Sequence, residues 1–132
     1  MALKKTQLLD IVSVTGISTV GILTVGVTQT AGGVGIASTT YIKNVIMHNT
    51  GLGTCRVSLY LNPNTSPITG YGVTGNRFLR IDMVPNETTF FESTYPIVLT
   101  HNDTLSVEVN AADTGTGIGS AVNFIVNGDT DV

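Results

Sequence analysis

The stretch TCRVSLYLN, residues 54–62, decides the fold class. Its apolar residues fall on every second position: Cys55, Val57, Leu59 and Leu61. Side chains of an extended strand point alternately to opposite faces, so this period predicts a strand with one face in a core. The same period recurs in four further stretches: GILTVGVTQ (21–29), RFLRIDMV (77–84), DTLSVEVN (103–110) and AVNFIVNG (121–128).

A sixth stretch, TYIKNVIMHN (40–49), is apolar on both faces. Ile42 and Ile46 share one face, and Val45 and Met47 share the other. This pattern predicts a central strand covered on both sides, or a strand with one side buried in an oligomer.

Turn signals separate these runs at intervals of roughly ten residues, as in all-β sandwiches. We therefore predict an all-β protein with a single antiparallel β-sandwich, jelly-roll-like, of about seven or eight strands. Residues 1–39 are predicted to form an N-terminal β-arm or hairpin, and residues 40–132 the sandwich domain. The predicted core residues are Leu59, Leu61, Leu79, Ile81, Leu105, Val107, Val109, Phe124 and Val126.

The N-terminal segment is rich in Val, Ile, Thr and Gly, and its charges are confined to Lys4, Lys5 and Asp10. Its backbone groups need hydrogen-bond partners once they leave water. We expect part of residues 8–28 to pair as β-structure, either at the edge of its own sandwich or with a neighbouring subunit.

The composition of the chain limits the classes of function that it can have. Hydrophobic residues make up 42% of the chain, enough for a core, but charged residues only 11%, under half the usual share. Such a weakly charged surface is expected to be covered by copies of the chain or by partners.

The net charge of −3 argues against nucleic-acid binding through a basic surface. Polar residues interrupt every apolar run, so neither a signal peptide nor a membrane helix is expected, and the chain is expected to be soluble.

The sequence offers few residues for metal or acid–base chemistry. A zinc or iron site needs three or four ligands, and the chain has two histidines, His48 and His101, and one cysteine, Cys55, on an apolar strand face. We interpret His48 and Asn49 as hydrogen-bonding to loop backbone where their strand ends. His101 and Asp103 fit a tight turn. No catalytic, cofactor-binding or metal site is predicted, no cofactor is expected, and the protein is not expected to be an enzyme.

Other motifs support only weak functional interpretations. GTGIGS (115–120) lacks the following helix that a phosphate loop requires, and Asn86 and Asn102 head glycosylation triplets without a secretory signal. The carboxylates are scattered on outward faces: Asp82, Glu87, Glu92 and Glu108. The alternative function is a carbohydrate-recognition sandwich, for which Tyr60 and Tyr71 are the candidate stacking residues.

The order of the segments carries a resemblance. YIKNVIMHNTG runs into RVSLYL, and RFLRIDMVPNETTFFE, YPIVLTHNDTLSVEV and AVNFIVNG follow. This ordered set, over residues 40–128, resembles the small β-sandwich virion structural proteins of tailed bacteriophages, most closely those of phages infecting marine cyanobacteria. His101 and Asn102 stand where that family often has a glycine turn.

The resemblance implies a non-enzymatic structural component of a phage virion. Such a component is present in many copies, and we expect capsid decoration or a neck or tail fitting. The implied partners are copies of itself and other virion proteins, with no nucleic acid and no membrane. The implied location is the virion, assembled in the host cytoplasm.

Overall fold

The computed structural model describes residues 3–15, 18–25, 27–29, 35–37, 39–63, 74–100, 103–111 and 120–131. These residues form strands and one short 3-10 helix. Their bounds are β1 (Leu3–Thr15), β2 (Ser18–Thr24), β3 (Val27–Gln29), β4 (Gly35–Ala37), β5 (Thr40–Asn49), β6 (Cys55–Asn62), η1 (Thr74–Asn76), β7 (Arg77–Met83), β8 (Thr88–Leu99), β9 (Thr104–Ala111) and β10 (Ala121–Asp131).

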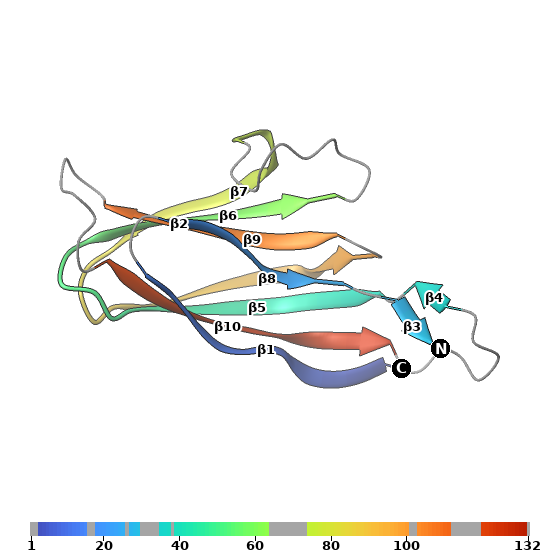
Figure 1. Cartoon of the computed structure of the whole chain (residues 1–132). Helices are drawn as coiled ribbons and strands as arrows, with labels where there is room; N and C mark the ends of the chain where they lie inside the picture. The colour runs from blue at the N-terminus through green and yellow to red at the C-terminus, as the bar shows by residue number, and fades with distance from the viewer. Residues whose placement is uncertain are drawn as a thin grey trace.

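Two four-stranded antiparallel sheets face each other (Figure 1), with strand orders β1-β10-β5-β8 and β2-β9-β6-β7. A small third sheet, the β3–β4 hairpin, lies between β2 and β5 in the chain. Eight strands with this order in two sheets are a jelly roll. The predicted fold class, an antiparallel jelly-roll-like sandwich, is confirmed.

The topology follows from pairing the chain with itself in reverse order. β1 pairs with β10, β2 with β9, β5 with β8 and β6 with β7. The chain is thus one long antiparallel ribbon that is folded over, so that β10 also meets β5 and β9 also meets β6. Each sheet therefore combines strands from both halves of the sequence.

The N-terminal segment pairs within its own subunit. The sequence predicted an arm or hairpin over residues 1–39, set apart from a sandwich over 40–132, but β1 and β2 are edge strands of the two sandwich sheets. Burial explains this placement, because Val14 is buried in the core and Leu9 and Val12 pack against it. The predicted strand over 21–29 is also divided: β2 ends at Thr24, and β3 pairs with β4 instead.

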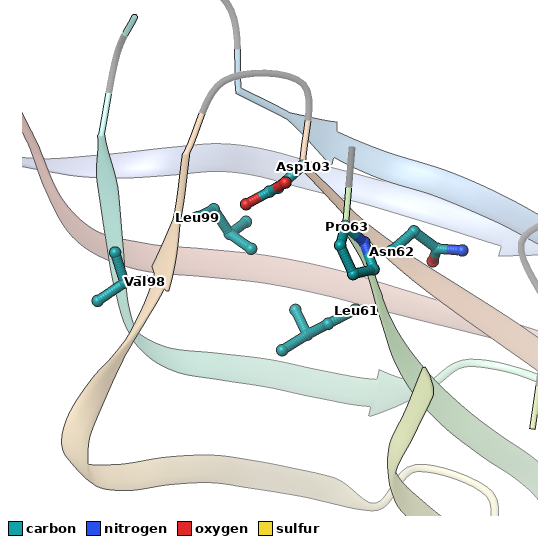
Figure 2. A pocket seen from close by; sticks show the side chains of 6 residues that line it. All are labelled: Leu61, Asn62, Pro63, Val98, Leu99 and Asp103. Carbon is teal, nitrogen blue, oxygen red and sulfur yellow. The ribbon is translucent and has the colours of Figure 1, made fainter. Parts of the chain in front are cut away.

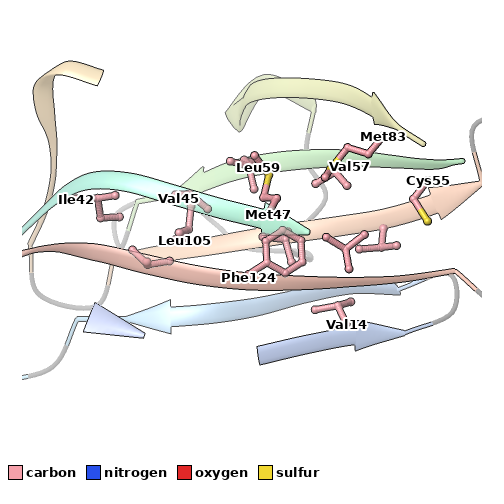
Figure 3. Packing of buried hydrophobic residues seen from close by; sticks show 14 of the residues in the cluster. Val14, Ile42, Val45, Met47, Cys55, Val57, Leu59, Met83, Leu105 and Phe124 are labelled. Atoms are coloured by element: carbon pink, nitrogen blue, oxygen red, sulfur yellow. The ribbon is translucent and has the colours of Figure 1, made fainter. Parts of the chain in front are cut away.

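The core fills the space between the sheets (Figure 3). Of the nine predicted core residues, Leu61, Leu79 and Ile81 are partly buried and pack against the cluster, and the other six are fully buried. Phe124 is the largest fully buried side chain among the described residues. At one side of the sandwich, Phe78 of β7 and Phe91 of β8 meet edge to face with ring centroids 5.3 Å apart, so an aromatic pair closes the gap between these edge strands.

A β-bulge at Lys43 explains the mixed pattern of β5. Asn44 pairs with Asn127 but Ile42 pairs with Gly128, so Lys43 is the extra residue and the alternation shifts there. Ile42 and Val45, three residues apart, are consequently both buried. The sequence had placed these two side chains on opposite faces, because strict alternation does not anticipate a bulge.

Candidate functional site

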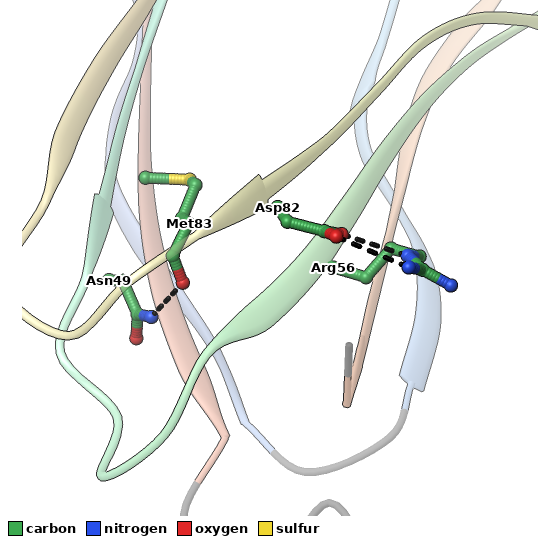
Figure 4. A network of polar contacts seen from close by, with 4 residues as sticks. All are labelled: Asn49, Arg56, Asp82 and Met83. Atoms are coloured by element: carbon green, nitrogen blue, oxygen red, sulfur yellow. Dashed lines mark hydrogen bonds and ion pairs between the residues drawn. The ribbon is translucent and has the colours of Figure 1, made fainter. Parts of the chain in front are cut away.

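Asn49 organises the turn at the end of β5 (Figure 4). Its side chain is 0% exposed. The Nδ2 group donates to the carbonyl oxygens of Met83 at 2.8 Å and Gly53 at 3.0 Å, and Oδ1 accepts from the Gly51 amide at 2.8 Å. Cys55 Sγ, buried as predicted, lies 3.4 Å from the same Oδ1. A single amide thus joins β5, the following turn and β7.

His48 has a different role from the one predicted. Its Nδ1 lies 2.7 Å from Thr88 Oγ1 on the neighbouring strand β8, so this side chain bonds across the sheet and not to loop backbone. The physical reason is alternation: Met47 and Asn49 are buried, which directs His48 to the opposite face. Only Asn49 performs the turn function that the sequence assigned to both.

The turn from β7 to β8 has the geometry expected of its sequence. Asn86 has φ 65°, and the Glu87 amide donates to the Val84 carbonyl at 3.1 Å. Proline followed by a residue with positive φ is typical of a type II turn. In such a turn Asn is tolerated at the second of the two central positions, where φ is positive. Asn86 therefore has a conformational task in this turn.

One ion pair stands out on the surface of β6 and β7 (Figure 4). Arg56 donates through Nε to Asp82 Oδ1 at 2.8 Å and through Nη2 to Oδ2 at 3.2 Å. The hydrogen bond from Arg56 lowers the pKa of Asp82; partial desolvation opposes this shift, and the charges of Arg56 and Arg80 add to it. Asp82 is therefore held as a carboxylate, which suits a structural pair and not a proton donor.

A small hollow of about 150 Å³ opens at the far end of β6 (Figure 2). Its lining residues are Leu61, Asn62, Pro63, Val98, Leu99 and Asp103. Pockets for small-molecule ligands usually measure about 300–1,000 Å³, so this space suits a single aliphatic side chain at most.

Asp103 closes the neighbouring turn as predicted, since its Oδ2 accepts from the Thr100 amide at 2.9 Å and from Thr100 Oγ1 at 3.0 Å. His101 and Asn102 lie outside the described residues, so the prediction for His101 is not addressed.

Of the two candidate sugar-stacking tyrosines, the structure describes Tyr60. Tyr60 is only 2% exposed, and its hydroxyl donates to Glu108 Oε1 at 3.2 Å. The prediction that Tyr60 is a surface residue is wrong, because alternation tells which face of a strand a residue is on but not whether that face is covered. Tyr71 and residues 115–119 of GTGIGS lie outside the described part of the chain.

Glu108 and Glu87 are engaged in separate parts of the structure. Glu108 Oε2 lies 3.3 Å from Thr19 Oγ1, and Glu87 Oε1 accepts from the Val84 amide at 3.2 Å. Among the residues that the structure describes, no three His, Cys, Asp or Glu side chains form a group able to hold a metal ion. No helix in the same residues has the length and apolar character needed to cross a membrane.

A feature that sequence reasoning missed lies on the outer face of the sheet β1-β10-β5-β8, the side away from the core. Four apolar side chains form a row across its strands, here called the apolar row: Ile11, Ile125, Ile46 and Phe90. Ile46 pairs with both Ile125 and Phe90, and Ile11 lies in the β1 irregularity opposite Ile125. Ile11 is 62% exposed and Phe90 64%. The register between strands creates this row, and a single stretch of sequence does not reveal it.

The rows beside the apolar row are polar. One contains Ser13, Asn123, His48 and Thr88; the other contains Asn127, Asn44 and Glu92. Asn127 Nδ2 donates to Asn44 Oδ1 at 2.9 Å. The other sheet differs, since there Arg56 pairs with Asp82, and Ser58 lies between Arg80 and Glu108. The two sheets therefore present unlike faces. The outer face of β2-β9-β6-β7 carries several charged side chains, whereas the outer face of β1-β10-β5-β8 carries apolar and amide groups together with Glu92 and a Lys43–Asp129 ion pair at 3.0 Å.

No family model matches the chain, and no curated protein matches it. Among solved structures, a chain in the structure of infectious bursal disease virus, Gx strain, is similar with 9% sequence identity and a TM-score of 0.39. The match covers 98% of this chain and 30% of the viral chain. A similarity this low carries no argument about function.

Proposed function

We propose that this protein is a non-enzymatic structural component of a virion, present in many copies. The observation that carries the proposal is the apolar row on a weakly charged jelly roll. Its two most exposed members, Ile11 and Phe90, lie on the edge strands β1 and β8. Solvent-exposed apolar groups in a continuous row are typical of surfaces that a protein partner covers.

The charge content supports the same proposal. A chain with only 11% charged residues has little electrostatic protection against association when free in solution. Inside an assembly the same composition is favourable, because few charges lose their water at the contacts between subunits.

The ordered resemblance over residues 40–128 points to a tailed-phage particle. Within it we favour capsid decoration, with a neck or tail fitting as the alternative position. The partners would be copies of this chain and other virion proteins, and assembly would take place in the host cytoplasm. The carbohydrate-recognition alternative loses one of its two stacking candidates, because Tyr60 is buried.

Quantitative mass spectrometry of purified particles tests this proposal. The expected result is that the chain co-purifies with particles through a density gradient, at many copies relative to a portal protein. A chain that is expressed in infected cells but absent from washed particles would refute it.

A further inference from the structure

The apolar row has the composition of an interface centre. Ile46 and Ile125 lie in its middle on the inner strands β5 and β10, and Ile11 and Phe90 lie at its two ends. On both sides the flanking rows carry hydroxyl, imidazole and amide groups. An apolar centre with a polar border is the usual arrangement of protein interfaces.

We propose that this outer face is a two-fold interface, which packs against the same face of a second copy of the chain. The proposal deepens the proposed function, since it names the first contact that copies make with one another. In a two-fold contact the same patch serves both subunits, so the patch must be complementary to itself.

Charge supports self-complementarity. Among the described side chains of this face, Glu92 lies on the edge strand β8, and Lys43 of β5 forms an ion pair at 3.0 Å with Asp129 of β10 beside the row of Asn44 and Asn127, so these two charges compensate each other. Two copies can therefore approach without bringing like charges together at the centre. The side-chain amides of Asn44, Asn123 and Asn127 each contain a donor and an acceptor, so they can pair with the same residues of the second copy.

The size of the face also fits a pair of copies. Four strands about 4.8 Å apart and about ten residues long, at about 3.3 Å per residue, span roughly 600 Å² in projection. A stable interface buries about 800 Å² of accessible surface per partner. Because side chains protrude from the sheet, the accessible area of this face is larger than its projected area. Sheets that pack face to face at a small angle use such surfaces.

The first test places a cation in the apolar row of the full-length chain. Phe90→Lys and Ile11→Lys change exposed side chains, so the fold is expected to survive, which thermal unfolding checks. Each is expected to raise the dissociation constant of self-association by about tenfold or more, because a charge loses its water in the contact. Sedimentation equilibrium measures this constant. Val84→Lys, at a 54% exposed turn position, is the matched control and should leave association unchanged.

A second test does not depend on weakening the contact. Ile46→Cys and Ile125→Cys, alone and as a mixture, are treated with a short bismaleimide, which can bridge the spacing of about 10 Å between packed sheets, and are examined for covalent dimers. Rapid cross-linking is expected for at least one of these samples. The unchanged chain, whose Cys55 is buried, and Val84→Cys should not cross-link.

The result that overturns the proposal is an unchanged chain that stays monomeric at all concentrations and does not cross-link through residues 46 or 125. Association that survives both lysine substitutions, with cross-linking through Val84→Cys instead, would also overturn it. A monomeric chain that is nevertheless abundant in purified particles refutes the two-fold contact and leaves the virion role standing, so the two proposals fail separately.

Discussion

Neighbouring residues at the end of β5 illustrate how one position in a strand decides between two tasks. Asn49 points inward and joins three segments through buried hydrogen bonds. His48 points outward and bonds to one side chain, Thr88. The sequence predicted polar residues serving a turn here, which Asn49 does, but it could not assign the task to one of the two.

We predict that Asn49→Ala lowers the free energy of unfolding by about 2–3 kcal/mol, because buried partners such as the Met83 carbonyl lose their hydrogen bonds. His48→Ala, which removes one partly exposed bond, should cost about 0.5–1.5 kcal/mol. Urea unfolding followed by circular dichroism measures both. A larger loss for His48→Ala than for Asn49→Ala would contradict the assignment.

The ion pair between Arg56 and Asp82 predicts a pH dependence. Because the pKa of Asp82 is lowered in the folded state, the pair contributes stability above the unfolded-state pKa, and this stability is lost as the pH falls through the folded-state pKa. Both side chains are solvent-exposed, so the effect should be small. Asp82→Asn should make the free energy of unfolding less dependent on pH in the acid range. The same dependence on pH in both proteins would count against the pair.

At the level of elements, alternation was a reliable guide where strands are regular. It predicted β6, β7, β9 and β10, because each has one face in the core and regular pairing over most of its length. It was incomplete for β5, where the bulge at Lys43 shifts the inward face. Alternation also could not predict which strands are neighbours, because this depends on how the antiparallel ribbon folds over. It could not predict the apolar row, because the row depends on the register between strands.

Gly128 provides a test of the bulge. A Cβ atom at this position would lie 1.9 Å from the Tyr41 carbonyl oxygen, so backbone of β5 would have to move. Gly128→Ala is expected to lower the melting temperature by more than about 5 °C, equivalent to over about 1 kcal/mol for a domain of this size.

Gly53→Ala is the matched control, because nothing lies within 4 Å of an added Cβ there. Equal melting temperatures for the two alanine variants would show that β5 and β10 do not approach as described.

At the level of the whole molecule, the N-terminal strands complete both sheets. β1 covers the edge of β10 and β2 covers the edge of β9, and they bring Val14 and its neighbours to the core. Of the two pairings expected from the sequence, the structure contains the one at the edge of the subunit's own sandwich. The segment was hard to assign because its β1 part is only loosely periodic.

Deletion of residues 1–24 should therefore prevent folding of the isolated subunit, because two edge strands and part of the core are lost together. Proton–nitrogen NMR spectra of the truncated chain are expected to show poorly dispersed amides. A well-dispersed spectrum would mean that the rest of the sandwich folds without β1 and β2.

If this jelly roll is a repeated part of a particle, a cryo-electron microscopy map of the intact particle will contain it. We expect density for two four-stranded sheets with the order β1-β10-β5-β8 and β2-β9-β6-β7, repeated at symmetry-related positions, with the apolar row buried against a neighbouring copy. A map that accounts for all of its protein density with other chains would contradict this expectation.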